Sequence, residues 1–197
     1  MSSFLYWITK NLCRLAFKIG WGLTVTGAEN IPKEGAALIA ANHRSLADPP
    51  LVGVSMRRQV HFLAKEELFR FRPFGWYIKQ LNAHPLKRGG GDVAAFKMAR
   101  KILKSGEMLI VFPEGRRSKT DAFGPAKAGV GMLSTMGNVP VIPTYVHNSG
   151  NLKEMRKISV HFGKPILPDP ALSYQQMAEK VMQAIIDLKS GLATAKI

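Results

Sequence analysis

The sequence feature that most constrains the fold is a pair of short apolar runs that each end abruptly at ionisable residues. The first run, residues 36–41, stops at residues 42–48 (NHRSLAD), and the second, residues 108–111, stops at residues 112–118 (FPEGRRS). Such a run is typical of a buried strand whose polar continuation lies at the edge of a sheet. We therefore expect both polar clusters to follow strands and to carry chemistry.

Strand-like and helix-like segments alternate along the rest of the chain. We expect strands at residues 23–26, 36–41, 60–64, 107–112, 139–146 and 158–162 and helices at residues 4–23, 51–56, 93–104, 126–136 and 173–188. The last helix begins with a capping box from Ser173 to Gln176, and residues 65–88 are expected to be irregular. This alternation predicts an α/β fold: a single layered domain with a mixed, mostly parallel sheet flanked by helices.

The N-terminal segment has the pattern of an amphipathic helix. Lys10, Arg14 and Lys18 recur every four residues and share one face. The other face is apolar, with tryptophans near both ends, and comprises Phe4, Leu5, Trp7, Ile8, Leu12, Leu15, Ala16, Ile19 and Trp21. Such a helix either lies at a membrane interface or packs on the core of its own domain. The basic composition of the whole chain favours an anionic membrane surface.

The formal net charge of +15 over 197 residues favours an anionic partner. No zinc-finger or RNA-binding aromatic motif accompanies this charge, so we expect no nucleic-acid partner. The single cysteine, Cys13, has no internal disulfide partner and fits a reducing compartment. No secretory signal is evident, and basic residues interrupt the longest apolar stretch, so no membrane span is expected. No cofactor and no metal is expected either, because metal-ligand spacings and a complete P-loop are missing.

The first polar cluster offers a general base. His43 and Asp48 are five positions apart in a loop, so the chain can double back and place the carboxylate on one imidazole nitrogen. The other nitrogen is then free to take a proton, which is worth about 10²–10⁴ in rate. Because there is no Gly-x-Ser-x-Gly elbow, the expected nucleophile is a hydroxyl of the substrate. Backbone N–H groups near residues 42–45, or at the start of the next helix, are expected to stabilise the developing oxyanion.

Four blocks of the sequence, in order, resemble the 1-acylglycerol-3-phosphate acyltransferases (lysophosphatidic acid acyltransferases), a family of glycerolipid acyltransferases. The blocks are Asn42-His43 with Asp48; Lys65-Glu66-Glu67-Leu68 with Pro73, Gly75 and Arg88; residues 112–118 followed by Lys127 and Gly129; and residues 139–143 (VPVIP). The resemblance implies that His43, oriented by Asp48, deprotonates the sn-2 hydroxyl of a lysophosphatidate-like acceptor. That hydroxyl would attack the thioester of acyl-CoA or an acyl carrier protein, giving phosphatidic acid.

The resemblance also implies that the third block binds the glycerol phosphate of the acceptor. The expected substrate-binding residues are Arg88, Glu114, Gly115, Arg116, Arg117 and Lys127. Arg117 suits this role because a guanidinium recognises phosphate with two hydrogen bonds. Glu114 cannot bind phosphate favourably and is expected to hold an arginine or a glycerol hydroxyl. The aromatic residues of segment 68–77 would either line an acyl channel or pack in the core.

The chain departs from the family pattern at Arg116, where the family usually has threonine. A second guanidinium indicates either an additional phosphate contact or a different headgroup. Another lysophospholipid, or the lyso form of an amino-acid lipid, is therefore an alternative acceptor. A non-catalytic basic lipid-binding protein is the alternative from another class, against which the intact His43–Asp48 pair argues. The expected organisation is a membrane-interface helix at residues 1–23 and an acyltransferase domain at residues 24–197, peripheral or monotopic at the cytoplasmic face of a membrane.

Overall fold

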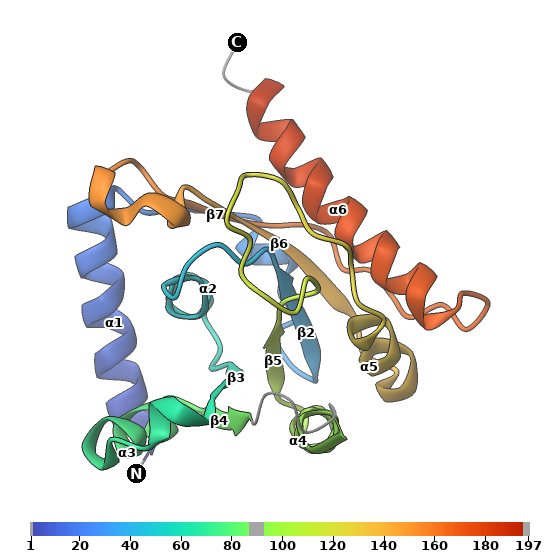
Figure 1. Ribbon diagram of the computed structural model, residues 1–197, viewed down its shortest axis with the longest axis horizontal. Helices are drawn as coiled ribbons and strands as arrows, with labels where there is room; N and C mark the ends of the chain where they lie inside the picture. Colours follow the sequence, from blue (N-terminus) through green and yellow to red (C-terminus); the bar gives the residue numbers. More distant parts are fainter. Residues whose placement is uncertain (1, 87–92, 195–197) are drawn as a thin grey trace.

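Strand β2 (Ala37–Ala41) lies fully buried at the centre of a seven-stranded sheet in the computed structural model, which describes residues 2–86 and 93–194 (Figure 1). The strand order is β1-β7-β6-β2-β5-β3-β4. The other strands are β1 (Thr24–Thr26), β3 (His61–Lys65), β4 (Ala83–Leu86), β5 (Met108–Val111), β6 (Val141–His147) and β7 (Ser159–Phe162). Among the pairs that these seven strands form, β6–β7 is antiparallel and the others are parallel. The predicted mixed, mostly parallel sheet is therefore confirmed.

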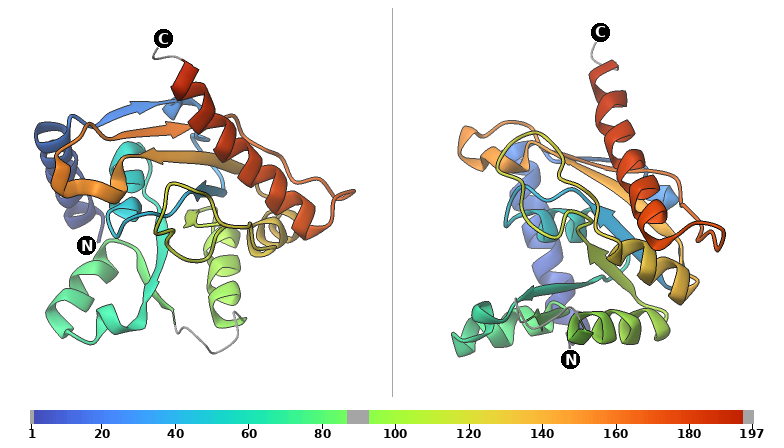
Figure 2. Two further views of the ribbon diagram at one scale, coloured as in Figure 1. Left: turned by 45° about the horizontal axis from the view of Figure 1, so that its top comes forward. Right: turned by 45° about the vertical axis from the view of Figure 1, so that its right-hand side comes forward.

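Helices cover both faces of this sheet (Figure 2). Ala37, Ile39 and Ala41 point to a core shared with α1 (Ser2–Trp21) and α2 (Asp48–Ser55). Leu38 and Ala40 point to a second core, which is shared with α4 (Val93–Lys104), α5 (Gly129–Gly137) and α6 (Tyr174–Thr194). Because helices cover both faces of the sheet, neither face of β2 is exposed to solvent. Its sequence is therefore one continuous apolar run instead of an alternation of apolar and polar residues.

Residues 65–88 differ from the irregular segment that the sequence predicted. Their described part contains the 3₁₀ helix η2 (Glu66–Phe69), helix α3 (Arg72–Gln80) and the edge strand β4. Pro73 stands in the first turn of α3, where proline is compatible with a helix. A Cβ at Gly75 would lie 2.6 Å from the carbonyl oxygen of Phe69, so glycine is what lets α3 pack against η2. Pro73 and Gly75 therefore serve the start and the packing of a helix in a segment that was expected to be irregular.

The remaining elements depart from the predicted ranges mainly at their ends. Helix α2 begins at Asp48 instead of residue 51, and α6 continues to Thr194. The predicted capping box is present: the N–H of Gln176 donates to Ser173 Oγ, and the N–H of Ser173 donates to Gln176 Oε1. Two further 3₁₀ helices connect strands, η1 (Ala28–Asn30) and η3 (Ser149–Glu154).

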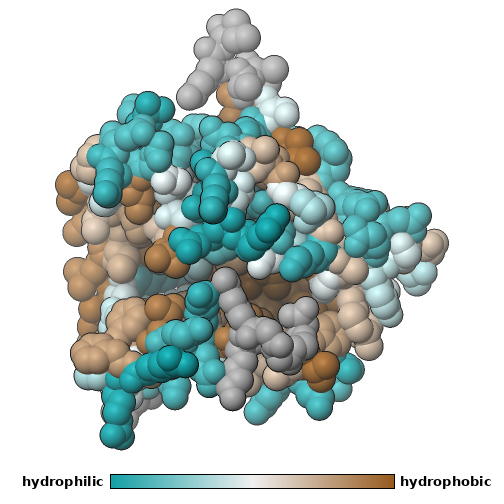
Figure 3. Space-filling view, in the orientation of Figure 1, coloured by the Kyte–Doolittle hydropathy of each residue, from teal (hydrophilic) through white to brown (hydrophobic). Residues whose placement is uncertain are grey.

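Helix α1 contacts the rest of the protein mainly through a face other than the predicted apolar face, of which Trp21 does pack on the core and donates to the carbonyl of Leu152 at 2.8 Å. The buried hydroxyl of Tyr6 accepts the backbone N–H of Val60 at 3.2 Å, and Thr9 and Tyr77 share a hydroxyl–hydroxyl hydrogen bond of 3.0 Å. Much of the predicted apolar face stays exposed, namely Phe4, Trp7, Leu12, Leu15, Ala16 and Ile19. Figure 3 shows hydrophobic atoms along the edge where α1 lies in Figure 1. Among the helices of residues 2–86 and 93–194, none combines the length and the apolar composition needed to cross a bilayer.

Candidate active site

Three loops of the site meet because three neighbouring strands are parallel. In the register of the sheet, Ala40 of β2 lies beside Val111 of β5, and Ala41 lies beside Thr144 of β6. The carboxyl ends of β5, β2 and β6 therefore reach the same edge of the sheet, where α/β proteins bind ligands. Both polar clusters noted in the sequence continue from these strands, together with the loop that follows β6.

The imidazole of His43 is held by the carboxylate of Asp48. His43 Nδ1 and Asp48 Oδ2 are 2.9 Å apart, and Asp48 is fully buried at the start of α2. The same Oδ2 atom accepts the backbone N–H groups of Arg44 and Ser45 at 2.6 and 2.7 Å. A negative carboxylate is also favoured at a helix N-terminus. With Nδ1 engaged by a carboxylate, Nε2 of His43 is the nitrogen left to accept a proton.

The loop after β5 holds the backbone and the ring of His43. Glu114 Oε1 accepts the N–H of His43 at 3.2 Å, and the N–H of Ser118 donates to the carbonyl of His43 at 2.8 Å. The ring of Phe112 stacks on the imidazole with 3.9 Å between the ring centroids and 17° between the planes. The second cluster thus positions the histidine of the first, a relationship that the sequence reasoning missed.

Glu114 differs from the sequence expectation that it holds an arginine or a glycerol hydroxyl. Its side chain is buried, and its second oxygen, Oε2, accepts the N–H of Gly124 at 2.9 Å. Within the described part of the chain, backbone amides and no arginine engage the two carboxylate oxygens. A buried carboxylate is stabilised by such charge-assisted hydrogen bonds. The carboxylate therefore ties the loops after β2 and β5 together.

Three of the amides expected to stabilise an oxyanion donate to carboxylates within the protein. The N–H of His43 donates to Glu114, and those of Arg44 and Ser45 donate to Asp48. The first turn of α2 contains Pro49 and Pro50, which have no N–H. The N–H groups of residues 43–45 are therefore engaged within the protein, and oxyanion donors near residues 42–45 or at the start of α2 stay a prediction.

Asn42 is a further positioning residue, which the sequence reasoning quoted without giving it a role. It is buried, its Nδ2 donates to the carbonyl of Val146 at 3.0 Å, and its Oδ1 accepts the N–H of Val146 at 2.7 Å. This amide pair fixes the end of β2 to β6. The position of an asparagine directly after a buried strand is the signal from which this role could have been predicted.

Residues predicted to bind the acceptor are partly brought together. Gly115 has φ +67°, and an ideal Cβ there would lie 2.8 Å from Lys127 Cε and Nζ, so the lysine side chain crosses directly over the glycine. Lys127 also donates its backbone N–H to the carbonyl of Pro113 at 2.9 Å. Arg116 and Arg117 are exposed, and within residues 2–86 and 93–194 no carboxylate pairs with either guanidinium. Arg88 lies outside the described residues.

Two other histidines form a separate pair, at the amino end of β3. His61 Nδ1 and His84 Nε2 are 2.8 Å apart, and their rings are stacked. Burial lowers the pKa of both imidazoles; Glu107 raises that of His61 by a smaller amount, and Lys101 lowers that of His84 further. The pair stands at the opposite end of the strands from His43, and we expect it to be structural.

The chain is similar in sequence to known proteins. A family described as Acyltransferase matches residues 22–147. The chain is 29% identical over 166 residues to a 1-acyl-sn-glycerol-3-phosphate acyltransferase of Bacillus subtilis, with 82% of each protein covered. It is 32% identical over 134 residues to a protein of the same name from Streptococcus pneumoniae, covering 66% of this chain and 49% of that protein.

The fold is also similar to a solved structure. The crystal structure of the 1-acyl-sn-glycerophosphate acyltransferase of Thermotoga maritima matches 95% of this chain and 81% of that chain, with a TM-score of 0.78 and 28% sequence identity. The likeness includes helix α1, which the family match at residues 22–147 does not reach.

Proposed function

The chain belongs to the Acyltransferase family, as a 1-acylglycerol-3-phosphate acyltransferase-like enzyme of phospholipid biosynthesis, and on this premise we propose its reaction and the roles of its residues. The enzyme transfers a fatty acyl group to the free sn-2 hydroxyl of 1-acylglycerol-3-phosphate and so forms phosphatidic acid. The donor is a thioester, either acyl-CoA or an acylated carrier protein. The observation that carries this proposal is the His43–Asp48 contact of 2.9 Å at the carboxyl end of β2.

His43 is the general base of the proposed mechanism. Nε2 takes the proton of the acceptor hydroxyl as its oxygen attacks the thioester carbonyl carbon, which forms the new C–O bond. Asp48 stabilises the resulting imidazolium and keeps its orientation, as the acid of a catalytic triad does. When the tetrahedral intermediate collapses, the C–S bond breaks and the imidazolium returns the proton to the departing thiolate. Protons and electrons balance without a cofactor.

The acceptor phosphate is assigned to the cations around Gly115. Arg116, Arg117 and Lys127 are exposed, and Gly115 leaves room for the lysine to lie across the loop. We also assign Arg88 to this phosphate, on the resemblance alone. Glu114 does not touch substrate in this proposal; it acts as a positioning residue through the backbone of His43.

The exposed apolar surfaces of α1 and α3 are proposed to lie at the membrane interface. Helix α3 contacts α1 through Thr9 and Tyr77, and its segment adds the exposed side chains Leu68, Phe71, Phe74 and Trp76. Exposed cations on the same elements, Arg14, Lys18, Arg70 and Arg72, suit anionic headgroups. A contiguous apolar surface of this kind indicates a lipid contact in a peripheral protein. The aromatic side chains of segment 68–77 therefore extend this surface more than they fill the core.

An acyl-transfer assay with a panel of acceptors tests the proposal. The protein is incubated with acyl-CoA or acylated carrier protein and with lyso-lipids that have or lack a phosphate, and the products are identified by mass spectrometry. We expect phosphatidic acid from lysophosphatidate, and a loss of product in His43→Ala while His84→Ala retains activity. Unchanged transfer by His43→Ala would contradict the mechanism.

Arg116 supports a second candidate acceptor, a lyso-lipid with another headgroup. Its exposed guanidinium stands where the family usually has threonine. The variant Arg116→Thr separates the two cases: if Arg116 adds a phosphate contact, the KM for lysophosphatidate rises in the variant. If Arg116 selects another headgroup, the variant gains activity on lysophosphatidate at the expense of the other lyso-lipid.

A further inference from the structure

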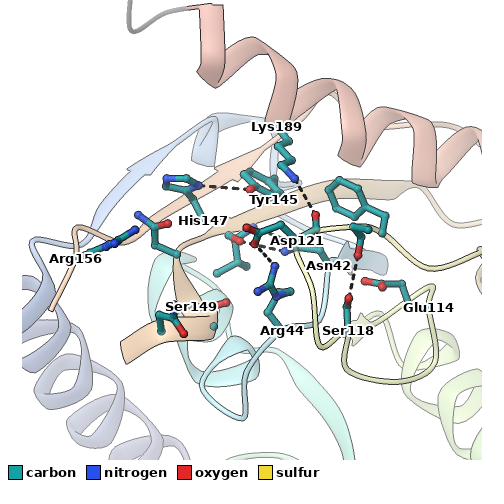
Figure 4. Close-up of a pocket in the computed structure, with 16 residues that line it drawn as sticks. Asn42, Arg44, Glu114, Ser118, Asp121, Tyr145, His147, Ser149, Arg156 and Lys189 are labelled. Atoms are coloured by element: carbon teal, nitrogen blue, oxygen red, sulfur yellow. Dashed lines mark hydrogen bonds and ion pairs between the residues drawn. The ribbon is translucent and has the colours of Figure 1, made fainter. Parts of the chain in front are cut away.

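A basic cavity of about 170 Å³ lies beside the catalytic loop, on the side of β6 (Figure 4). Three cations reach it from separate segments: Arg44 from the loop after β2, Arg156 from the segment between η3 and β7, and Lys189 from α6. Arg116, Arg117 and Lys127 do not line it. The cavity therefore adjoins the proposed acceptor site through Glu114 and Ser118, but its three cations differ from those assigned to the acceptor phosphate.

Arg44 presents an incompletely used guanidinium to this cavity. One nitrogen, Nη1, pairs with the exposed carboxylate of Asp121. Nε is buried and has no hydrogen-bond partner among the described residues. The guanidinium lies directly against the backbone of Gly150, where an added Cβ would be 3.1 Å from Nη2. A glycine at this position thus lets the arginine lie in the cavity wall.

Ser149 is a second group without a partner. Its side chain is 1% exposed, it lines the cavity, and its Oγ makes no hydrogen bond within the described part of the chain. A buried hydroxyl left unpaired is unfavourable. Ser149 and Arg44 thus place two polar groups without partners in the wall of the cavity.

The carboxylates near the cavity do not prevent its cations from binding an anion. Lys189 Nζ donates to the carbonyl of Asp121 at 2.8 Å, which leaves donors free on the ammonium, and Arg156 Nε pairs with Glu154 at 2.7 Å. Both Asp121 and Glu154 are exposed, so solvent screens their charge. Glu114 also lines the cavity, but backbone amides engage its two oxygens.

We propose that this cavity binds a phosphate ester, the one on the pantetheine arm of the acyl donor, a proposal that rests on the acyl-transfer function above. Both candidate donors, acyl-CoA and an acylated carrier protein, carry a phosphate on that arm. The cavity has room for a phosphate with its first carbons. The acceptor phosphate lies close to the reacting hydroxyl and has Arg116, Arg117 and Lys127 available to it. The donor phosphate, at the far end of a long arm, needs a separate set of cations.

The first test measures KM separately for the two substrates. Arg156→Ala, Lys189→Ala and the double variant are compared with Lys180→Ala, a matched control that removes an exposed lysine from α6 outside this cavity. Loss of a charge-assisted hydrogen bond should raise the donor KM by about tenfold for each cation, with the acceptor KM and kcat within about twofold of wild type. A donor KM equal to that of Lys180→Ala, or a rise in the acceptor KM instead, would overturn the assignment.

The second test measures binding without catalysis. Thermal unfolding of the full chain is followed with 4′-phosphopantetheine, with pantetheine, which lacks the phosphate, and with glycerol 3-phosphate. Only the phosphorylated arm should stabilise the wild type through this cavity, and the double variant should lose that effect while still responding to glycerol 3-phosphate. If the double variant responds to 4′-phosphopantetheine like the wild type, the inference is wrong. A wild type that fails to transfer acyl groups would contradict the proposed function but leave this binding result interpretable.

Discussion

Glu114 accepts the backbone N–H of His43 at 3.2 Å, although 71 positions separate the two residues in the chain. The contact exists because β2 and β5 are parallel neighbours whose following loops meet. With the hydrogen bond from Ser118 and the stacked ring of Phe112, it fixes the loop that carries His43, the proposed general base. The second polar cluster is therefore part of the support of the base as well as the proposed phosphate site.

Asp48→Asn is expected to lower kcat by about 10²–10⁴. Asparagine carries no charge to stabilise the imidazolium, and its amide oxygen is a weaker acceptor than the carboxylate oxygen that engages His43, Arg44 and Ser45. Steady-state kinetics with saturating substrates measures the effect, and Asp187→Asn on α6 serves as the exposed control. Wild-type kcat in Asp48→Asn would show that the carboxylate does not act on the imidazole.

Glu114→Ala is expected to lower both stability and kcat. The substitution leaves the N–H groups of His43 and Gly124 without their acceptor, at about 1–3 kcal/mol for each group that stays buried and unpaired. Urea denaturation measures the free energy of unfolding, and the exposed Glu34→Ala should stay within about 0.5 kcal/mol of wild type. If only the acceptor KM changed, at unaltered stability, Glu114 would be a substrate ligand instead.

Gly115→Ala and Gly35→Ala form a matched pair. Both glycines have positive φ, +67° and +77°, so each alanine should cost about 1–2 kcal/mol of stability. Only at Gly115 would the new Cβ displace a side chain, that of Lys127; the space around Gly35 is open within 4 Å. We expect the acceptor KM to rise in Gly115→Ala alone. If both variants had the same KM for the acceptor, Lys127 would have no role in acceptor binding.

Ile19→Gln is expected to weaken vesicle binding by about tenfold or more without lowering stability. Ile19 is 77% exposed, so the folded protein loses no packing, whereas insertion of an isoleucine into an apolar phase contributes about 1.5–3 kcal/mol. Co-sedimentation with anionic vesicles measures the effect. Leu167→Gln removes an equally accessible apolar side chain, 69% exposed, from the loop before α6 and should bind as wild type. Equal loss in both variants would argue against an interface at α1.

Stability is expected to fall as the pH drops below about 6.5, the ordinary histidine value. Burial lowers the pKa of His61, His84 and His161 in the folded protein. Between pH 6.5 and the lower pKa values of the folded protein, the unfolded chain therefore binds more protons than the folded protein does. The free energy of unfolding rises with pH across this window. Urea midpoints measured from pH 7.5 to 5 should show this slope, and His84→Gln should reduce it. A slope unchanged in His84→Gln would exclude the His61–His84 pair as its source.

The sequence predicted best those features that depend on neighbouring residues. The apolar run at residues 36–41 is a strand because every side chain in it is buried, and the five-residue spacing from His43 to Asp48 is closed by the loop as expected. The segment at residues 65–88 was mispredicted because its proline and glycine suit helix packing once η2 lies beside α3. That proximity is not visible in local spacing.

The face of α1 that touches the protein could not be read from its own pattern. Amphipathic periodicity distinguishes the apolar face from the basic face, but both candidate surroundings, membrane and core, favour the same apolar face. In the structure Tyr6, Thr9, Lys10 and Trp21 make hydrogen bonds to the domain, while Leu15 and Ile19 remain outside. The choice depended on which groups the rest of the domain offers to the helix.

By itself, the sequence determined the α/β class, the strand ends that carry chemistry, and the pairing of His43 with Asp48, because each depends on burial or spacing within a few residues. The tertiary structure alone decided that Glu114 supports His43 and that Arg44, Arg156 and Lys189 surround one cavity. Those relationships join residues far apart in the chain, and they arise only when β5, β2 and β6 pair in parallel and bring their ends to one edge of the sheet.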